Sequence, residues 1–412
     1  MKRIVAIDIL RGFALLGILV MNMMSFAMPD IAYYNPAAFG GDEWFNRATY
    51  AFVHIFADQK FMALFSMLFG ASLMLLINNL ERKGEKVGRF HYTRNFWLLI
   101  IGLLHGTLIW SGDILTIYAI CAFVLYFLRH VAPKWQFVLG MIIFLLPAAG
   151  YIAGDLIIGQ MSPAETAALY AYWQPSDAEI ASEISHYRGD YLTQVIDRFS
   201  GEETQSDLAL DLYGLVLYIE FFARAFGMML MGMALYSWGV LTGHSSKQFY
   251  KRLILIGLPI GVVLASLGVW WNSSTAWSAV QSMFIGRLPN LIATPLVAGG
   301  YIALVMLWSQ NTVLIGLQDR LAATGRMALT NYIGQSIIGT FIFYGFGLGL
   351  FGSFNRFMLL PVIVVIWLIQ LWLSPIWLKH FRYGPLEWAW RSLSYRKLQP
   401  IRRWVQTPVH AK

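Results

Sequence analysis

The segment from Ile4 to Asn22 is apolar over a length that spans a bilayer, yet it contains Asp8 and Arg11. Their spacing of three residues places both side chains on one face of a helix. Charged groups in a spanning helix are costly, and they usually face the protein interior or an aqueous cavity. The segment therefore predicts one of two things: the wall of a functional site, or an ion pair that fixes the helix near the membrane surface.

The composition is that of a polytopic membrane protein. Apolar residues make up 58% of the 412 and charged residues 13%, whereas a soluble protein has about 25% charged residues. We expect the lipid bilayer as a partner and assign the net charge of +8 to the placement of loops, not to nucleic acid. The single cysteine, Cys121, excludes a disulfide framework and a thiolate cluster, and we expect no metal. The sequence leaves open whether the chain forms a homo-oligomer.

Apolar windows of spanning length can be placed about ten times, which predicts an all-α transmembrane helical bundle forming a single membrane domain over residues 1–412. An even number of spans puts both termini on the same side. The windows lie near 5–27, 58–79, 92–110, 114–131, 135–158, 210–239, 253–271, 289–309, 327–348 and 357–378.

Basic residues test this topology, because they concentrate in cytoplasmic loops. They gather in both tails and in alternate loops, for example between 82 and 94 and between 247 and 252. The opposite side carries only Arg47, Lys60, Arg188, Arg198, Arg287 and Arg356. We therefore expect both termini in the cytoplasm and the chain in the bacterial inner membrane.

Two segments are expected outside the apolar core. The loop 160–208 is rich in Asp and Glu, and it predicts a short helical acidic cap on the periplasmic side. The tail 379–412 is basic and contains several tryptophans, which is typical of an amphipathic segment at the cytoplasmic interface.

Ionisable residues concentrate in or beside four predicted spans, toward their outer side, more than packing alone requires. They are His54, Asp58, Lys60, His105, Asp113, Glu220 and Arg224.

The histidines of this group suit proton transfer near neutral pH. His54 and Asp58 are four residues apart, so a carboxylate can orient an imidazole, as in acyl transfer. His105 lies about two helical turns before Asp113, so that pair requires the intervening turn to fold back. Each histidine also has a purely structural interpretation, and Glu220 with Arg224 is expected to be a structural ion pair.

At the predicted cytoplasmic side lie Asp8, Arg11, Arg94 and Arg326. Arginines at a cytoplasmic mouth suit a phosphorylated ligand, and they suit lipid head groups equally well. In the same predicted span as Arg326, Asn331 and Gln335 share a helix face, and we expect them to form hydrogen bonds with another helix.

Several stretches, taken together, resemble the YeiB-like bacterial inner-membrane proteins, a family classed as a domain of unknown function. The resemblance covers the chain from end to end, with a C-terminal signature region at about 240–400. The stretches are DILRGFALLGILVMN, KFMALFSMLFG, GLLHGTLIWSGDIL, GRMALTNYIGQS and GPLEWAWR.

That family in turn resembles a remote branch of the transmembrane acyltransferase superfamily. The link is the first helix: an Asp, then Leu-Arg-Gly, then a polar residue fourteen positions after the Asp. This polar residue is the catalytic histidine in acyltransferase-3 enzymes. Here it is Asn22, as in the lysosomal heparan glucosaminide acetyltransferase, whose histidine comes later in the following loop. This chain has no histidine there until His54.

The resemblance implies a cytosolic acyl-CoA donor and an acceptor at the periplasmic face. Arg11, with Asp8, Arg94 and Arg326, would hold the phosphates of the donor. His54 or His105 would take the proton of the acceptor, with Asp58 or Asp113 orienting it.

Two other classes of function fit the same residues. A small-molecule transporter or exporter would use the charged pairs as a proton relay without chemistry. A structural or regulatory membrane protein would use them for packing alone.

Overall fold

The computed structural model describes residues 4–200 and 208–403. Within these residues the regular structure is helical, and the sole extended pairing there is an isolated antiparallel bridge between Phe381 and Arg402. The all-α helical bundle predicted from the sequence is confirmed.

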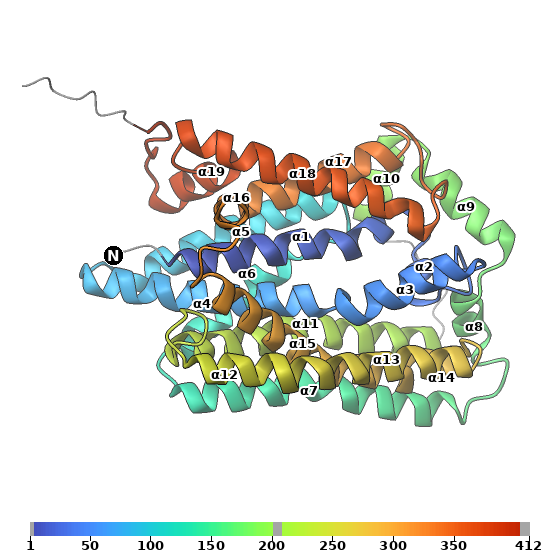
Figure 1. The fold of residues 1–412 in the computed structure, drawn as a ribbon. Helices are drawn as coiled ribbons and strands as arrows, with labels where there is room; N and C mark the ends of the chain where they lie inside the picture. The colour runs from blue at the N-terminus through green and yellow to red at the C-terminus, as the bar shows by residue number, and fades with distance from the viewer. Residues whose placement is uncertain (1–3, 201–207, 404–412) are drawn as a thin grey trace, which may run out of the picture.

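Long helices form the body of the bundle, and several of them run along a common axis (Figure 1). They are α1 (Val5–Ala27), α4 (Lys60–Arg82), α5 (Val87–Leu108), α7 (Pro133–Ile158), α11 (Leu208–Ser237), α13 (Leu258–Ser274), α15 (Leu288–Trp308), α17 (Ala328–Phe343) and α18 (Arg356–His380). The shorter helices are α2 (Ile31–Tyr34), α3 (Trp44–Phe56), α6 (Leu115–Leu125), α8 (Ala167–Trp173), α9 (Asp177–Tyr187), α10 (Tyr191–Ser200), α12 (Lys247–Arg252), α14 (Ala279–Met283), α16 (Ile315–Arg326) and α19 (Pro385–Tyr395).

Seven helical stretches in the described part of the chain are long and apolar enough to cross a bilayer. They contain α1, α4, α7, α11, α13, α15 and α18. Each of the ten predicted windows overlaps a helix, but α5, α6 and α17 lie outside these seven. The fold is compatible with a membrane protein, and ten spans stay a prediction.

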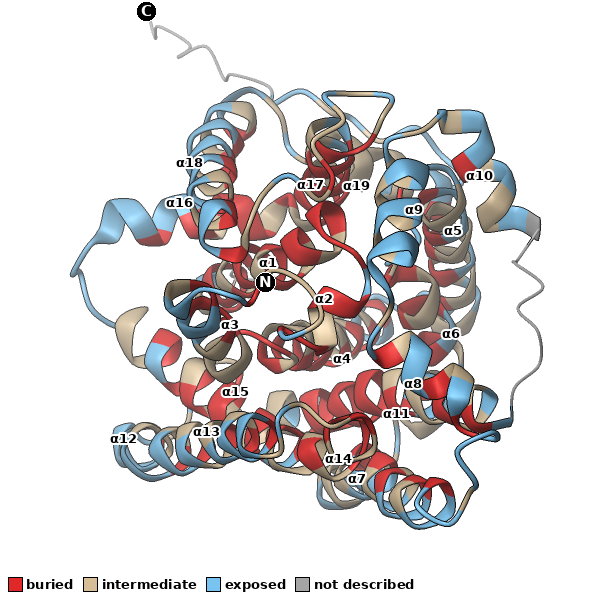
Figure 2. Cartoon of the chain, turned by 90° about the vertical axis from the view of Figure 1, so that its right-hand side faces the viewer, coloured by how far each residue is buried: buried red, intermediate tan, exposed pale blue. Residues whose placement is uncertain are grey.

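Helix α1 lies at the centre of the bundle, surrounded by the other long helices (Figure 2). The buried share of its most apolar window is 67%, against 28% for α7 and α18 and 22% for the stretch containing α13. Its neighbours are α4, α15, α16, α17 and α18. Asp8 is buried within the bundle at 6% exposure, whereas the Arg11 side chain is partly exposed.

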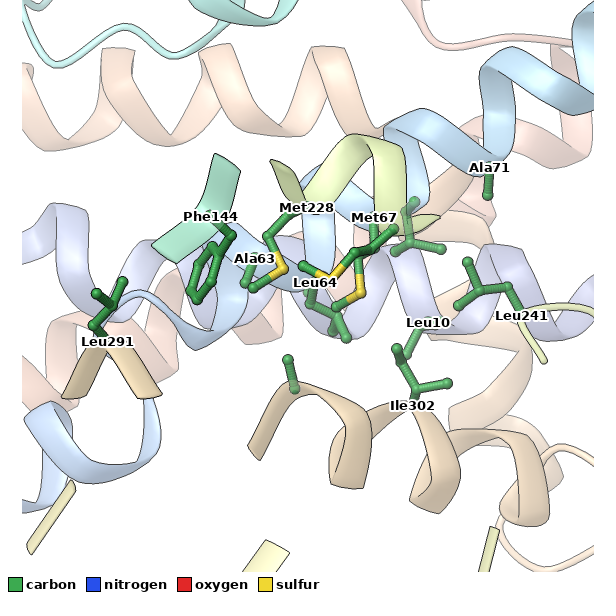
Figure 3. Packing of buried hydrophobic residues seen from close by; sticks show 14 of the residues in the cluster. Leu10, Ala63, Leu64, Met67, Ala71, Phe144, Met228, Leu241, Leu291 and Ile302 are labelled. Carbon is green, nitrogen blue, oxygen red and sulfur yellow. The ribbon is translucent and has the colours of Figure 1, made fainter. Parts of the chain in front are cut away.

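Aliphatic and thioether side chains fill the space between α1, α4, α11 and α15 (Figure 3). Leu10, Leu64, Met67, Met228 and Ile302 are each at most 4% exposed. In a bilayer such contacts stabilise the bundle mainly through dispersion and close packing, because lipid tails are as apolar as the core itself.

Glycines bring the backbones of α1 and α16 into direct contact. A methyl group at Gly12 would collide with the carbonyl of Leu321, and one at Gly325 would collide with the carbonyl of Asp8. Small residues allow this close approach between membrane helices. The contact fixes α16 against the N-terminal half of α1.

The start of α1 and helix α19 lie at the same end of the bundle (Figure 1). Helix α19 is held there by Glu387, which accepts hydrogen bonds from the Leu329 backbone N–H (2.7 Å) and the Thr330 hydroxyl (2.6 Å) at the start of α17. A carboxylate is favourable at a helix N-terminus, where backbone N–H groups lack partners. Which side of a membrane this end faces stays a prediction.

Helices α8, α9 and α10 lie at the opposite end, in the segment expected to be an acidic cap (Figure 1). Helix α9 begins with a capping box between Ser176 and Glu179. Arg188, after α9, donates hydrogen bonds to the Phe351 carbonyl (2.8 Å) and the Ser353 hydroxyl (2.7 Å). The segment is helical as expected, and it is tied to the bundle by polar contacts.

Glu183 fastens α9 to the loop between α1 and α2. Its Oε1 accepts a hydrogen bond from the Asp30 backbone N–H at 2.9 Å. Burial, together with the negative charge of the Asp30 side chain, raises the pKa of Glu183 to about 7. Burial and the Asp30 charge therefore favour the protonated carboxyl group and outweigh the backbone hydrogen bond, which favours the ionised form.

Replacing Gly325 by Ala should destabilise the bundle by about 1–3 kcal/mol, because the added methyl forces α1 and α16 apart. Gly316, on the same helix, has open space at its Cβ position, so Gly316→Ala should be neutral or slightly stabilising. Thermal unfolding of the purified variants, followed by tryptophan fluorescence, measures both. Equal stability of the two variants would show that the backbones are not in contact.

The docking of α9 should weaken as the pH rises. The folded-state pKa of Glu183, about 7, exceeds its ordinary value of 4.5. Between pH 4.5 and pH 7 the folded state therefore keeps a proton on Glu183 that the unfolded state has released. Stability is thus highest below pH 4.5, falls through this window, and levels off above pH 7. Hydrogen exchange of α9 amides, corrected for the intrinsic rate, should rise between pH 5 and 8.

The Glu183→Gln variant should lose this pH dependence, since its amide does not titrate. Asp177→Asn, at an exposed position of the same helix, should keep it. An unchanged pH profile in Glu183→Gln would assign the effect to another group.

Candidate functional site

A cavity of about 650 Å³ lies in the half of the bundle next to α2 and α8. Its walls come from the second half of α1, helix α2, the start of α4, the turn between α5 and α6, and α11. Among the predicted site residues, Asn22, Asp113, Glu220 and Arg224 line it. Three segments that are distant in sequence therefore contribute these polar groups to one cavity.

A smaller cavity of about 40 Å³ adjoins the large one. His54 and Asp58 line it, and Glu220, Arg224 and Arg287 border both cavities. The structure thus brings both predicted carboxylate–histidine pairs to the surroundings of one polar region.

His54 and Asp58 form the contact expected from their spacing, with 3.1 Å between His54 Nδ1 and Asp58 Oδ2. The carboxylate also accepts hydrogen bonds from the Tyr33 hydroxyl and the Asn290 side-chain amide, both at 2.9 Å. The imidazole stacks on Tyr50, with ring centroids 5.6 Å apart. Both members of the pair are therefore held in one orientation.

Lys60 contacts the backbone and a neighbour of this pair on the side away from the cavities. It is fully buried, and its ammonium donates to the His54 carbonyl at 2.8 Å and to Asn290 Oδ1. Lys60 is absent from the walls of both cavities. Its contacts fix the backbone of His54 and the amide of Asn290.

His105 and Asp113 are also paired, since the turn between α5 and α6 folds back. His105 Nδ1 lies 2.8 Å from Asp113 Oδ1, and Asp113 Oδ2 accepts the Thr116 backbone N–H at 2.8 Å. The His105 side chain is 1% exposed, and its ring lies beside Trp110 and Tyr332. Its Nε2 has no hydrogen-bond partner among the described residues.

Glu220 is shared by two arginines. Its two oxygens lie 2.8 Å from Arg224 Nη2 and 2.8 Å from Arg287 Nη2. Arg287 also approaches the hydroxyls of Tyr151 and Tyr213 at 3.4 Å. The predicted Glu220–Arg224 pair is present, and a third charged member joins it.

Sequence reasoning missed Arg287 and Asn290 as site residues. Arg287 was assigned to an outer loop, yet its head group reaches into the bundle. A signal was available, because Arg287 and Asn290 are one turn apart at the start of an apolar helix. Two polar residues at that spacing share a helix face.

The predicted donor-binding residues lie away from this region. Arg11 contacts Asp8 at 3.3 Å and the Ser72 hydroxyl at 2.9 Å, and Arg94 lies 4.3 Å above the Trp390 ring. Arg326 donates to the Arg382 carbonyl at 3.4 Å. These four residues line neither cavity.

Asn331 and Gln335 bond to another helix, as expected. Asn331 donates to the Ser374 hydroxyl at 3.1 Å, and Gln335 donates to Gln370 Oε1 at 2.9 Å. The Gln370 side-chain amide donates a hydrogen bond to the Asn331 carbonyl at 2.9 Å. These polar groups join α17 to α18 and take no part in the cavity walls.

Among the residues the structure describes, no group of three or more His, Cys, Asp or Glu side chains is placed to hold a metal ion. The ionisable side chains at the walls of the two cavities include an imidazole, carboxylates and guanidinium groups.

The chain is similar to known proteins over nearly its whole length. Residues 235–397 match the family described as "Protein of unknown function (DUF418)". "Uncharacterized protein YeiB" of Escherichia coli (strain K12) is 33% identical over 409 residues, covering 97% of this chain and 98% of that protein. "Uncharacterized protein YxaH" of Bacillus subtilis (strain 168) is 31% identical over 415 residues, covering 97% and 96%. The chain therefore belongs to the YeiB-like family, whose domain is of unknown function.

Proposed function

We propose that the protein is an integral-membrane acyltransferase of the bacterial inner membrane. It moves an acyl group, for example acetyl, from cytosolic acyl-CoA to an acceptor that enters the cavity from the periplasmic face. The observation that carries the proposal is the His54–Asp58 pair, which is fixed in one orientation at the wall of a polar cavity inside the bundle.

His54 meets the geometric needs of a general base. Its ring borders the small cavity of about 40 Å³, which has room for water but not for an acceptor. The proton of an acceptor in the adjoining large cavity therefore passes to His54 through a water molecule. Asp58 orients the imidazole and stabilises its protonated form. His105 has a comparable partner, but it is almost fully enclosed. We therefore assign the base to His54 and a supporting role to His105.

The reaction follows from this assignment. An acceptor hydroxyl or amine attacks the thioester carbonyl of the donor while its proton passes to the His54 imidazole. The carbon–sulfur bond breaks, and the departing thiolate takes up the proton from the imidazolium to give CoA. No acyl-enzyme is required, and the buried Cys121 lines neither cavity.

The basic residues at the other end of the bundle support a donor that approaches from the opposite side. Arg11 is partly exposed, and Arg94 lies within electrostatic range of Arg11 and Arg391. Arginines bind phosphate groups well because of their planar, charged donor array. Arg11 and Asn22 are about 16 Å apart along α1, which is the distance that an acyl donor held at Arg11 would have to bridge to reach the cavity.

A transporter without chemistry also fits a polar cavity in a membrane bundle. One feature favours catalysis, because a transport route does not require an imidazole oriented by a carboxylate.

His54→Gln should lower turnover by about 10²–10⁴-fold, the usual loss when a general base is removed. His105→Gln should retain turnover within about tenfold, because the base is still present. Turnover is measured as thiol release from acetyl-CoA in proteoliposomes supplied with a bacterial envelope extract as the acceptor. Acetyl-CoA binding should be unchanged in both variants.

If the large loss occurs only in His105→Gln, the base is His105. If both variants keep near-normal turnover while binding acetyl-CoA, histidine catalysis is wrong, and transport becomes the better interpretation.

Arg11→Ala should weaken acetyl-CoA binding by about ten- to a hundredfold, the loss expected for one charge-assisted contact. Arg11→Lys should restore part of it, since an ammonium keeps the charge without the planar fork. Ser72→Ala, which removes only a hydrogen-bond partner of Arg11, should bind nearly normally. Isothermal titration of detergent-purified protein measures all three. Unchanged binding in a folded Arg11→Ala variant would remove Arg11 from the donor site.

A further inference from the structure

Arg224 has unused hydrogen-bonding capacity at the wall of the cavity. It is 2% exposed, and its Nη2 contacts Glu220. Its Nε and Nη1 have no partner among the described residues. A guanidinium group carries five N–H donors, and leaving buried donors unpaired is costly. Arg224 borders both cavities, so a ligand there can supply the missing acceptors.

The charges around Arg224 point to the sign of that ligand. Glu220 is one carboxylate shared between Arg224 and Arg287. These three groups, which are in direct contact, therefore sum to about one positive charge. Asp58 and Asp113 keep their own negative charges nearby, but their oxygens accept hydrogen bonds from other groups, and within the described residues neither forms an ion pair with Arg224. An anion in the cavity contacts the unpaired nitrogens of Arg224 directly.

We infer that this part of the cavity binds an anionic group, a carboxylate or a phosphate, and that the acceptor of the proposed reaction is an acidic molecule. Only the identification of this anionic molecule as the acceptor rests on the proposed function, because anion binding itself requires no reaction. The volume of about 650 Å³ suits a ligand of the size typical for small-molecule pockets. Aromatic walls that include Tyr34 and Tyr218 provide flat surfaces for a ring.

A purely structural ion pair accounts for less of the geometry. Glu220 and Arg224 on neighbouring turns of α11 would neutralise each other without Arg287. The third charge and the two unpaired nitrogens have no role in that interpretation, and buried charges without partners are strongly destabilising.

The test uses the full-length protein in phosphatidylcholine nanodiscs, with no acyl donor present. Thermal unfolding is followed by tryptophan fluorescence with two matched probe pairs: glucuronate against glucose, and glycerol 3-phosphate against glycerol. We expect at least one anionic probe, but neither neutral one, to raise the unfolding temperature. Arg224→Lys, which keeps a charge beside Glu220, should need at least tenfold more of that probe for the same shift.

Arg224→Gln should abolish the shift where it folds, and Arg320→Gln, at an exposed position of α16, should leave it unchanged. A shift given only by phosphatidylglycerol nanodiscs and lost in Arg224→Lys would identify a lipid phosphate as the anion. Equal shifts from anionic and neutral probes, or wild-type behaviour of Arg224→Lys, would overturn the inference. If the wild-type protein binds the anionic probe but His54→Gln keeps full turnover, the inference stands and only the proposed function is overturned.

Discussion

The need to neutralise charge inside an apolar bundle is the constraint on which this structure depends. An isolated ionised side chain costs several kcal/mol in such surroundings, and this cost is lowered only by partners with good geometry. The bundle meets the constraint in four places: Asp8 with Arg11, His54 with Asp58, His105 with Asp113, and Glu220 with two arginines. Three of these lie around the two adjoining cavities.

The central position of α1 connects the two polar regions. Its first turns carry Asp8 and Arg11 at the end of the bundle where α19 lies, and its second half carries Asn22 in the cavity wall. The glycine contact with α16 fixes the first region, and the close packing of Leu10 against α4, α11 and α15 fixes the helix between them. One rigid helix therefore sets the spacing between a basic surface and a polar cavity.

How much could be predicted from the sequence depended on how local each contact is. The all-α fold and the His54–Asp58 contact follow from composition and from a spacing of four residues. The His105–Asp113 pair depended on the direction of one turn, which periodicity does not define. Arg287 and Asn290 were missed because their partners Glu220 and Asp58 are 67 and 232 residues away. The number of spans was also uncertain, since α17 has only 16 residues and α6 only 11.

The two histidine pairs differ in what holds their carboxylates, and this difference separates their roles. Asp113 is fixed locally, by a backbone N–H three residues away. Asp58 is fixed by Tyr33 from α2 and by Asn290 from α15, which meet it only when the whole bundle is assembled. Preorganisation by distant elements makes the orientation of His54 a property of the tertiary structure, and a ligand that displaces α2 or α15 changes it directly. The His105–Asp113 pair is held within one turn at the wall of the large cavity, so it suits a fixed structural support, whereas the tertiary pair suits a site whose orientation depends on the assembled bundle.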